Sequence, residues 1–225
     1  MVVDYRDRKS LEFALRGIDV LISTVPGTTQ IRLIDAAIKV GVKRFAPAEF
    51  EGRPSRRAQD NAINRSMDRG KSAVLAHLHQ NRSKIESTVF VCGVLYERFA
   101  PGGLQNHRIG GSTGVSQEGN FMIDVRHLQA QVPYKNSVNG PVNLCLTAAQ
   151  DVGRFVTRAL DIRQPWPPEL IMHGERLTTY ELLTVVGRAR GNDIHVSAPV
   201  LWKLICIIQV VASVSKTSST MMLKA

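Results

Sequence analysis

The sequence predicts an α/β fold built around a parallel β-sheet, and two observations carry this prediction. Residues 17–50 form a complete strand, helix, strand pattern. Further apolar runs of strand length then alternate with stretches of helical periodicity as far as residue 191. Strands that alternate with helices along a chain pair in parallel, because each helix returns the chain to the same end of the sheet.

The first strand of this pattern is predicted over Ile18 to Val25. The run is apolar and rich in β-branched residues, is broken only by the Ser23-Thr24 pair, and ends at Pro26-Gly27. Such a run, without polar alternation, is typical of a parallel strand that is buried on both faces.

A helix is predicted to follow, capped by Thr28 or Thr29. Isoleucines and alanines recur along it at a spacing of about 3.6 residues, and Gly41 is placed to end it in the left-handed conformation. The next strand is then expected over Val42 to Ala46.

The carboxyl ends of these two strands are expected to lie side by side. A right-handed crossover between parallel strands places Thr24-Val25-Pro26 and Pro47-Ala48-Glu49 at the same edge of the sheet. Ligands of open α/β sheets bind at that edge. The sequence therefore predicts a ligand site there.

The amino-terminal segment predicts the end of a strand over Met1 to Tyr5 and a short helix over Asp7 to Arg16. Nucleotide-binding folds of this kind normally open with a strand, a glycine-rich turn and a helix whose first turn holds a pyrophosphate. The first forty residues contain no G-x-G-x-x-G pattern. We therefore expect an incomplete sheet in a chain truncated at its amino terminus.

The middle of the chain continues the pattern less regularly. A polar, arginine-rich loop is predicted over 51–69, a helix containing Lys71 follows it, and 88–94 is a strong strand with Gly93 near its end. Residues 96–119 contain six glycines and little periodicity. A connection of that length usually covers a site or is mobile.

Two capping-box spacings in the last third of the chain predict helix starts, one at Thr147 with Gln150 and one at Thr178 with Glu181. Gly191 is placed to end the second of these helices. Short strands are predicted over residues 121–125, 142–146 and 170–172.

The charge and cysteine content restrict the class of protein. The net charge is +10, but the bases lie in a polar segment without interleaved aromatic residues or a nucleic-acid-binding motif, which disfavours nucleic acid as a partner. Cys92, Cys145 and Cys206 lie far apart, so neither a disulfide framework nor a zinc site is predicted. The amino terminus lacks the apolar segment of a secretory signal, and a cytoplasmic protein is expected.

The apolar run at residues 200–214 contains Lys203 and Gln209. It is shorter than the roughly 20 residues that a membrane-spanning helix needs. We therefore predict a buried helix or strand there and no membrane span.

The segment from Ala14 to Phe50 resembles the central signature of the NmrA-like and isoflavone-reductase-like proteins, which are atypical short-chain dehydrogenases. The resemblance extends over about Val2 to Gly191. Later segments agree with it, namely YERFAPGG at 96–103, AQDVG at 149–153 and GERLT at 174–178. The missing glycine-rich turn and the residues after Gly191 depart from the family pattern.

The resemblance implies an incomplete Rossmann-type parallel sheet with a smaller substrate domain. Residues 1–95 would be a partial NAD(P)-binding Rossmann domain, and residues 96–225 mainly the substrate domain, with some segments returning to the sheet. The implied cofactor is NADP or NAD, with no metal. The residues expected to face the cofactor are Thr24, Val25, Pro26, Pro47, Ala48, Glu49, Phe50, Lys71 and Gly93.

Lys71 is the candidate catalytic residue. A lysine beside a nicotinamide can hydrogen-bond a substrate oxygen and relay a proton. The alternative interpretation is a surface lysine, because ten Lys and Arg residues lie between Lys43 and Lys84. The resemblance supports the catalytic interpretation without excluding the other.

Three functions remain open at this point. The first is an NAD(P)H-dependent oxidoreductase that acts on a small aromatic or polyketide-like metabolite. The second is a non-catalytic, redox-sensing regulator of the NmrA type that binds a protein partner, since both would keep the same fold and strand-end loops. The third is an inactive fragment whose sheet lacks the elements that should cover it.

Overall fold

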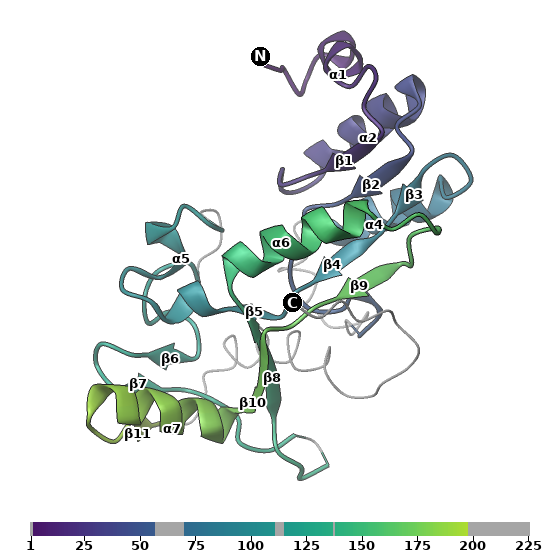
Figure 1. Ribbon diagram of the computed structural model, residues 1–225. Helices are drawn as coiled ribbons and strands as arrows, with labels where there is room; N and C mark the ends of the chain where they lie inside the picture. The colour runs from purple at the N-terminus through teal and green to yellow at the C-terminus, as the bar shows by residue number, and fades with distance from the viewer. Residues whose placement is uncertain (1, 57–69, 111–114, 137, 198–225) are drawn as a thin grey trace.

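The computed structural model describes residues 2–56, 70–110, 115–136 and 138–197, and Figure 1 shows how their helices and strands are arranged. Three predictions fall wholly or partly outside the described residues. These are the apolar segment 200–214, residues 57–69 of the arginine-rich loop and residues 111–114 of the glycine-rich connection.

A parallel sheet begins with the strand, helix, strand unit that the sequence predicts. Strand β1 (Val20–Ile22) leads into helix α2 (Thr29–Val40) and strand β2 (Arg44–Ala46). The two strands pair in parallel, with Val20 opposite Arg44. Strand β3 (Glu86–Ser87) pairs in parallel with the other side of β2. The α/β prediction is thus confirmed.

The sheet continues through β4 (Val89–Val91), which is separated from β3 by Thr88 alone. Strand β4 pairs in parallel with β9 (Glu169–Ile171). The segment 86–91 therefore connects β2 on one side to β9 on the other. Among the described residues β1 is an edge strand, paired with β2 alone.

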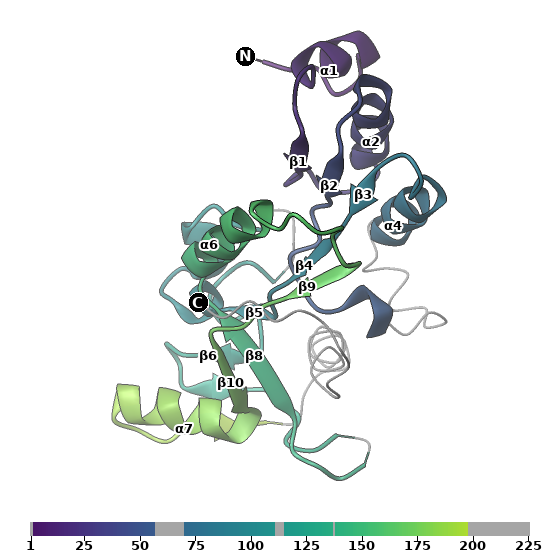
Figure 2. The same cartoon turned by 45° about the vertical axis from the view of Figure 1, so that its right-hand side comes forward.

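Helices cover both faces of this sheet (Figures 1 and 2). Helices α1 (Arg8–Ala14), α2 and α4 (Lys71–Gln80) lie on one face, and α6 (Ala149–Leu160) lies on the other. Phe45 packs with α1, α2 and α4 in the core on one face of the sheet. Phe90 packs beneath α6 in the core on the other face. Both phenylalanine side chains are fully buried.

The strand predicted at the amino terminus is wrong. Residues 2–4 form no strand, and Tyr5 lies in a turn in which Asp7 N–H donates to the Asp4 carbonyl at 3.2 Å. Asp7 then caps α1 by accepting a hydrogen bond from Lys9 N–H. Val3 is partly buried against the core of the helix layer, and none of the described strands lies beside residues 2–4 to pair with them.

The single strand predicted over 88–94 is divided in two. The chain turns at Gly93, whose φ is +71°, and continues as β5 (Val94–Leu95) in a second sheet. In that sheet β8 (Asn143–Thr147) lies between β5 and β10 (Glu175–Thr178). A residue with φ in this region interrupts a regular strand.

A further layer, made of a small separate sheet and helix α7 (Thr179–Arg190), lies at the lower end of Figure 1. Strand β6 (Ile123–Asp124) is shorter than predicted and pairs with β7 (Gln129–Ala130), which also pairs with β11 (His195–Val196). Helix α7 packs its Leu182 into the same core as the strands. Whether this layer begins at residue 96 as a separate domain stays a prediction.

Three predicted helix ends are confirmed, and a fourth end lacks its predicted bond. Gly41 ends α2 with φ 82° and ψ 28°. Thr178 with Glu181 forms a complete capping box at the start of α7, and Gly191 ends that helix in the left-handed conformation. Thr28 is the N-cap of α2, but its side chain makes no capping hydrogen bond. The predicted cap is thus in the right place without its expected interaction.

The capping box predicted at Thr147 is wrong. Ala148 is the N-cap of α6, and the buried Thr147 hydroxyl instead donates to the Cys92 carbonyl at 2.7 Å. The carboxylate of Glu97, distant in sequence, accepts the hydrogen bond from Ala149 N–H at 2.8 Å. A tertiary contact therefore replaces the local cap, and it satisfies one of the open N–H groups of the helix.

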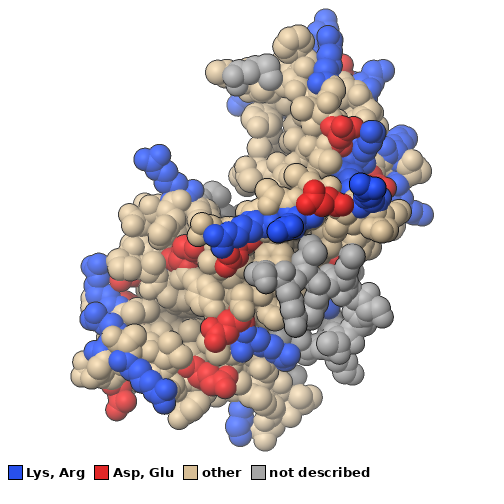
Figure 3. Space-filling model, in the orientation of Figure 1, with Lys and Arg blue, Asp and Glu red and all other residues tan. Residues whose placement is uncertain are grey.

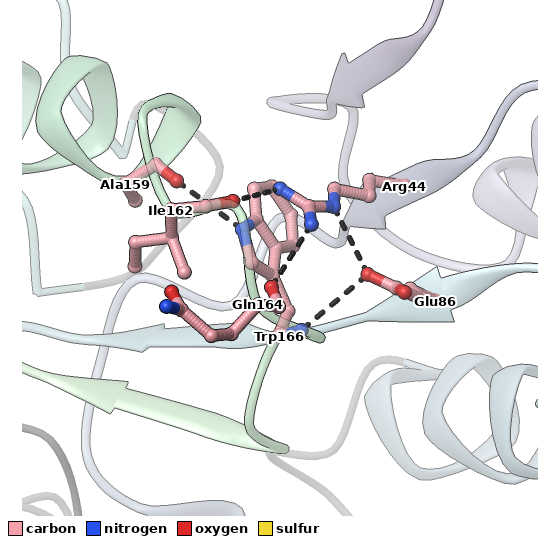
Figure 4. Close-up of polar contacts among 6 residues, drawn as sticks. All are labelled: Arg44, Glu86, Ala159, Ile162, Gln164 and Trp166. Atoms are coloured by element: carbon pink, nitrogen blue, oxygen red, sulfur yellow. Dashed lines mark hydrogen bonds and ion pairs between the residues drawn. The ribbon is translucent and has the colours of Figure 1, made fainter.

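Arg44 joins the sheet to the segment that follows α6 (Figure 4). Its guanidinium donates to the Ile162 carbonyl at 2.6 Å and to the Gln164 carbonyl at 3.0 Å. It also pairs with Glu86 on β3 at 2.9 Å. Two of these partners lie more than a hundred residues from Arg44 in the chain.

Trp166 packs at the centre of this contact. The Arg44 guanidinium lies 5.2 Å from the centre of its indole ring, within the range of a cation–π interaction. The indole N–H donates to the Ala159 carbonyl at 3.2 Å, and Phe90 meets the ring edge-on at 6.2 Å. The aromatic pair fixes the end of α6 against β4.

Basic side chains are spread over the face in Figure 3 and alternate with acidic ones. Several form ion pairs, as Lys43 does with Asp19 at 2.8 Å. Within the described ranges, every helix falls short of the length and apolar character that a membrane-spanning helix requires.

Candidate functional site

A cavity of about 720 Å³ lies at the carboxyl ends of β1, β2 and β4. This volume is within the roughly 300–1,000 Å³ typical of small-molecule sites. Its walls come from the loop after β1, the loop after β2, the start of α4, the turn at Gly93, the connection around α5 (Gly103–Asn106) and one side of α6. The position is the ligand edge that the parallel topology predicts.

Six of the nine residues predicted to face a cofactor line this cavity, and they come from four separate segments. Val25, Pro47 and Glu49 are not part of the lining. The Glu49 side chain is only 1% exposed and lies in the interior. The six lining residues are Thr24, Pro26, Ala48, Phe50, Lys71 and Gly93.

Gln30 holds two of the cavity loops together. It lies in the first turn of α2 and is 1% exposed. Its side-chain oxygen accepts a hydrogen bond from Ala48 N–H at 2.8 Å, and its side-chain nitrogen donates to the Gly27 carbonyl at 3.5 Å. The loop after β1 is thereby tied to the loop after β2.

Lys71 is the first residue of α4, directly after Gly70. Gly70 has a φ of +83°, and a Cβ there would lie 2.6 Å from the Thr28 side chain. The start of α4 thus packs tightly against the loop after β1. The Lys71 ammonium forms an ion pair with Glu51 at 2.6 Å, and both residues line the cavity.

Gly93 brings the second sheet to the floor of the cavity. A Cβ at this position would lie 2.4 Å from the Cys145 carbonyl oxygen, which no side chain can tolerate. The N–H groups of Cys92 and Gly93 donate to the Glu51 carbonyl at 3.1 and 3.3 Å. The turn is therefore held by β8 on one side and by the loop after β2 on the other.

The opposite wall is largely apolar. It includes Leu104 and Ile109 from the connection around α5, and Val152 and Val156 from α6. Arg98 also lines the cavity. An apolar wall of this kind excludes water from a bound ligand.

Arg98 fixes the outer part of this wall. Its guanidinium lies 4.5 Å from the centre of the Phe121 ring, within range of a cation–π interaction. It also donates to the Val115 carbonyl at 2.9 Å. The Arg98 guanidinium thus links the start of the connection 96–119 to Val115 near its end.

Cys92 and Tyr96 lie beside the cavity but are poor candidates for acid–base or nucleophilic roles. Burial, with the nearby Glu51 charge, raises the pKa of the Cys92 thiol to about 12. Burial and a hydrogen bond to Glu175 raise the pKa of the Tyr96 hydroxyl to about 12. Both groups therefore keep their protons at neutral pH, and Cys92 is not a thiolate nucleophile.

The loop after β2 is fixed from below by Glu169 on β9. The Glu169 carboxylate accepts hydrogen bonds from Arg53 at 2.8 Å and from Ser55 N–H at 3.1 Å. The Arg53 and Glu169 side chains are only 12% and 10% exposed. Although burial acts to raise it, the Glu169 pKa is lowered, because the hydrogen bonds from Ser55 and Arg53 outweigh burial.

This lowered pKa predicts a pH-dependent contribution to stability. Since the folded pKa lies below the unfolded one, the contribution is complete above about pH 4.5 and is lost as the pH falls through the folded value. Glu169→Gln is expected to reduce the free energy of unfolding by about 2 kcal/mol at pH 7. Urea unfolding of both proteins from pH 7 to pH 3 should show that the difference between their free energies of unfolding shrinks as the pH falls. A difference that stays constant with pH would contradict this account.

Several residues of the site were not predicted from the sequence. These are Gln30, which ties two cavity loops together, and Glu51 and Arg98, which line the cavity. Gln30 carries no local signal, because glutamine is common on exposed helix surfaces and its burial is seen only in the fold. Within the described ranges, His, Cys, Asp and Glu side chains form no group of three or more that could hold a metal ion.

A parallel sheet covered by helices on both faces, with a cavity at the carboxyl ends of its strands, places the chain in the Rossmann-type α/β class. The model of the NmrA-like family matches residues 1–198. The chain therefore belongs to the NmrA-like family.

Two relatives carry the name oxidoreductase. Oxidoreductase aprR of Aspergillus flavus is 38% identical over 100 residues, which cover 43% of this chain and 33% of that protein. Oxidoreductase BOA1 of Botryotinia fuckeliana is 25% identical over 176 residues, which cover 76% of this chain and 52% of that protein. The chain thus matches a third of one relative and about half of the other.

Among solved structures, the chain is similar to the complex of leucoanthocyanidin reductase with NADPH from Vitis vinifera. The TM-score is 0.67 at 19% identity, over 95% of this chain and 73% of that one. At this level of identity the likeness shows the fold alone.

Proposed function

We propose that this chain provides part of an NAD(P)H-dependent oxidoreductase that acts on a small aromatic or polyketide-like metabolite. The observation that carries the proposal is the position of Lys71, which reaches the cavity at the carboxyl edge of the sheet. The names of the two relatives and the NADPH complex of the plant reductase support it.

The described cavity fits the nicotinamide end of such a cofactor. Gly27 and Gly93 line it without side chains, which leaves room for a flat ring near the backbone. Pro26, Phe50 and Lys71 would contact that end of the cofactor, and Gln30 would keep their loops in place. The first forty residues offer no glycine-rich turn for the pyrophosphate.

We also assign indirect roles to three residues predicted to face the cofactor. Val25 lies between the lining residues Thr24 and Pro26, and Pro47 directly precedes the lining residue Ala48. Glu49 lies buried between Ala48 and Phe50. In this proposal the three shape the loops from behind rather than contact the cofactor.

The reaction would use few protein groups. When bound, the reduced nicotinamide supplies a hydride. The Lys71 ammonium would donate a hydrogen bond to the substrate oxygen, stabilise the negative charge that develops there, and pass it a proton that solvent then replaces on the lysine. Leu104 and Val152 would exclude water and pack on the apolar body of the substrate, which is why an aromatic or polyketide-like compound suits the cavity.

The cofactor part of the proposal is tested by a fluorescence titration with NADPH and NADH. Saturable binding below millimolar concentration is expected. A chain that bound neither nucleotide at millimolar concentration would overturn the proposal. Saturable binding without turnover of any aryl ketone or quinone would favour the redox-sensing regulator instead.

Lys71→Met is expected to lower kcat by about 100-fold or more, because the side chain loses its charge and its hydrogen bond to the substrate oxygen. NADPH oxidation with a panel of aryl ketones and quinones would measure the loss. Lys43→Met is a matched control, since Lys43 is exposed and paired with Asp19. Equal activity of the two variants would refute a catalytic role for Lys71.

A further inference from the structure

The ion pair between Glu51 and Lys71 is a charged contact inside the cavity for which the reaction proposed above has no role. The Glu51 carboxylate lies 2.6 Å from the Lys71 ammonium. The Lys71 side chain is 19% exposed and that of Glu51 is 42% exposed. The pair is therefore only partly screened by solvent and restricts where the ammonium can lie.

Lys71 is in an unfavourable place for a cation. It is the first residue of α4, and the amino-terminal end of a helix carries a partial positive charge. An unpaired ammonium would tend to turn away from this end and towards solvent. A carboxylate on the cavity side offsets both positive charges and holds the side chain inward.

Glu51 is well placed to act as a fixed support. Its carbonyl accepts hydrogen bonds from Cys92 and Gly93 N–H at 3.1 and 3.3 Å. These bonds involve its backbone, so a change of side chain leaves them intact. The residue thus connects the turn that forms the cavity floor to the ammonium on the cavity wall.

We propose that Glu51 is a positioning residue that holds the Lys71 ammonium at the point in the cavity where it meets the substrate oxygen. This inference rests on the proposed oxidoreductase function. Glu51 itself need not touch the substrate. Its role is to fix the direction of the lysine side chain, which matters because catalysis is sensitive to displacements of about 1 Å.

Glu51→Gln tests the role of the carboxylate charge, because it keeps the size of the side chain. We expect kcat for NADPH-dependent reduction of phenanthrenequinone, a quinone probe, to fall about tenfold. KM for NADPH and the melting temperature should stay within about twofold and about 2 °C of the original protein. Glu51→Asp should restore part of the activity, which a purely structural role would not predict.

The double variant Glu51→Gln with Lys71→Met shows whether Glu51 acts through the lysine. Glu51→Gln should add little to the loss caused by Lys71→Met, since groups that act as one unit are not additive. An unchanged kcat in Glu51→Gln, or a full tenfold loss on top of Lys71→Met, would overturn the proposal.

Reductive methylation with formaldehyde, read by mass spectrometry, separates this inference from the proposed function. Lys71 should be methylated several-fold faster in Glu51→Gln than in the original protein, because an amine released from its ion pair is more accessible. Asp19→Asn is the control, since the exposed Lys43 should react equally with or without it. Absence of NADPH binding would refute the reductase alone, whereas an unchanged methylation rate of Lys71 would refute the pairing.

Discussion

Gly93→Ala is expected to destabilise the protein by about 3 kcal/mol or more and to deform the candidate site. Two costs add at this position. The φ of +71° is unfavourable for any residue with a Cβ. The new Cβ would also lie 2.4 Å from the Cys145 carbonyl oxygen, and β8 cannot move away without losing its pairing with β5.

Thermal and urea unfolding would measure this loss, and Gly153→Ala is a matched control. Gly153 also lines the cavity, but it lies within α6 and nothing is within 4 Å of a Cβ built there. Alanine in a helix interior is expected to stabilise by about 0.5–1 kcal/mol. Similar stability of the two variants would show that the close contact with Cys145 is not a constraint.

Trp166→Ala is expected to reduce the free energy of unfolding by about 3–5 kcal/mol. The indole is 6% exposed and touches both the Arg44 guanidinium and the Phe90 ring. Its removal would leave a cavity beneath the end of α6. The Ala159 carbonyl would lose the hydrogen bond from the indole N–H and keep the one from Ile162 N–H.

The control for this prediction is Phe13→Ala, which removes an aromatic ring that is 63% exposed. Phe13→Ala should reduce the free energy of unfolding by less than about 1 kcal/mol. The loss in free energy of unfolding caused by Trp166→Phe should lie between those of the other two variants, since phenylalanine keeps an aromatic ring against Phe90 but lacks the indole hydrogen bond. Urea unfolding of the three variants would rank them; equal losses in Trp166→Ala and Phe13→Ala would contradict the role assigned to this contact.

The parts of the fold that depend on local sequence could be predicted. The apolar run before Pro26 and the glycine at position 41 mark the strand and the end of α2, because both signals act within a few residues. The capping box at Thr178 is local in the same way. The division of the strand at Gly93 was missed, since the sequence shows a glycine but not the β8 carbonyl that requires it.

The site could be predicted only as far as topology determines it. Parallel pairing of β1 and β2 brings Thr24 and Ala48 to one cavity, as expected. The bonds made by Gln30 and Glu97 join segments that only the folded chain brings together. Their residue types occur equally on exposed helix surfaces, so the sequence alone carries no sign of these bonds.

Two strands of the first sheet run directly into strands of the second sheet. Strand β4 continues through Cys92-Gly93 into β5, and β9 continues through His173-Gly174 into β10. Gly174 N–H binds the Leu146 carbonyl on β8 at 2.9 Å, close to the point where Gly93 meets the same strand. The core beneath α6 and the core that contains Leu182 are therefore linked by a pair of strands held against a third. From this connectivity we expect the parts on either side of residue 96 to unfold together, in a single cooperative transition.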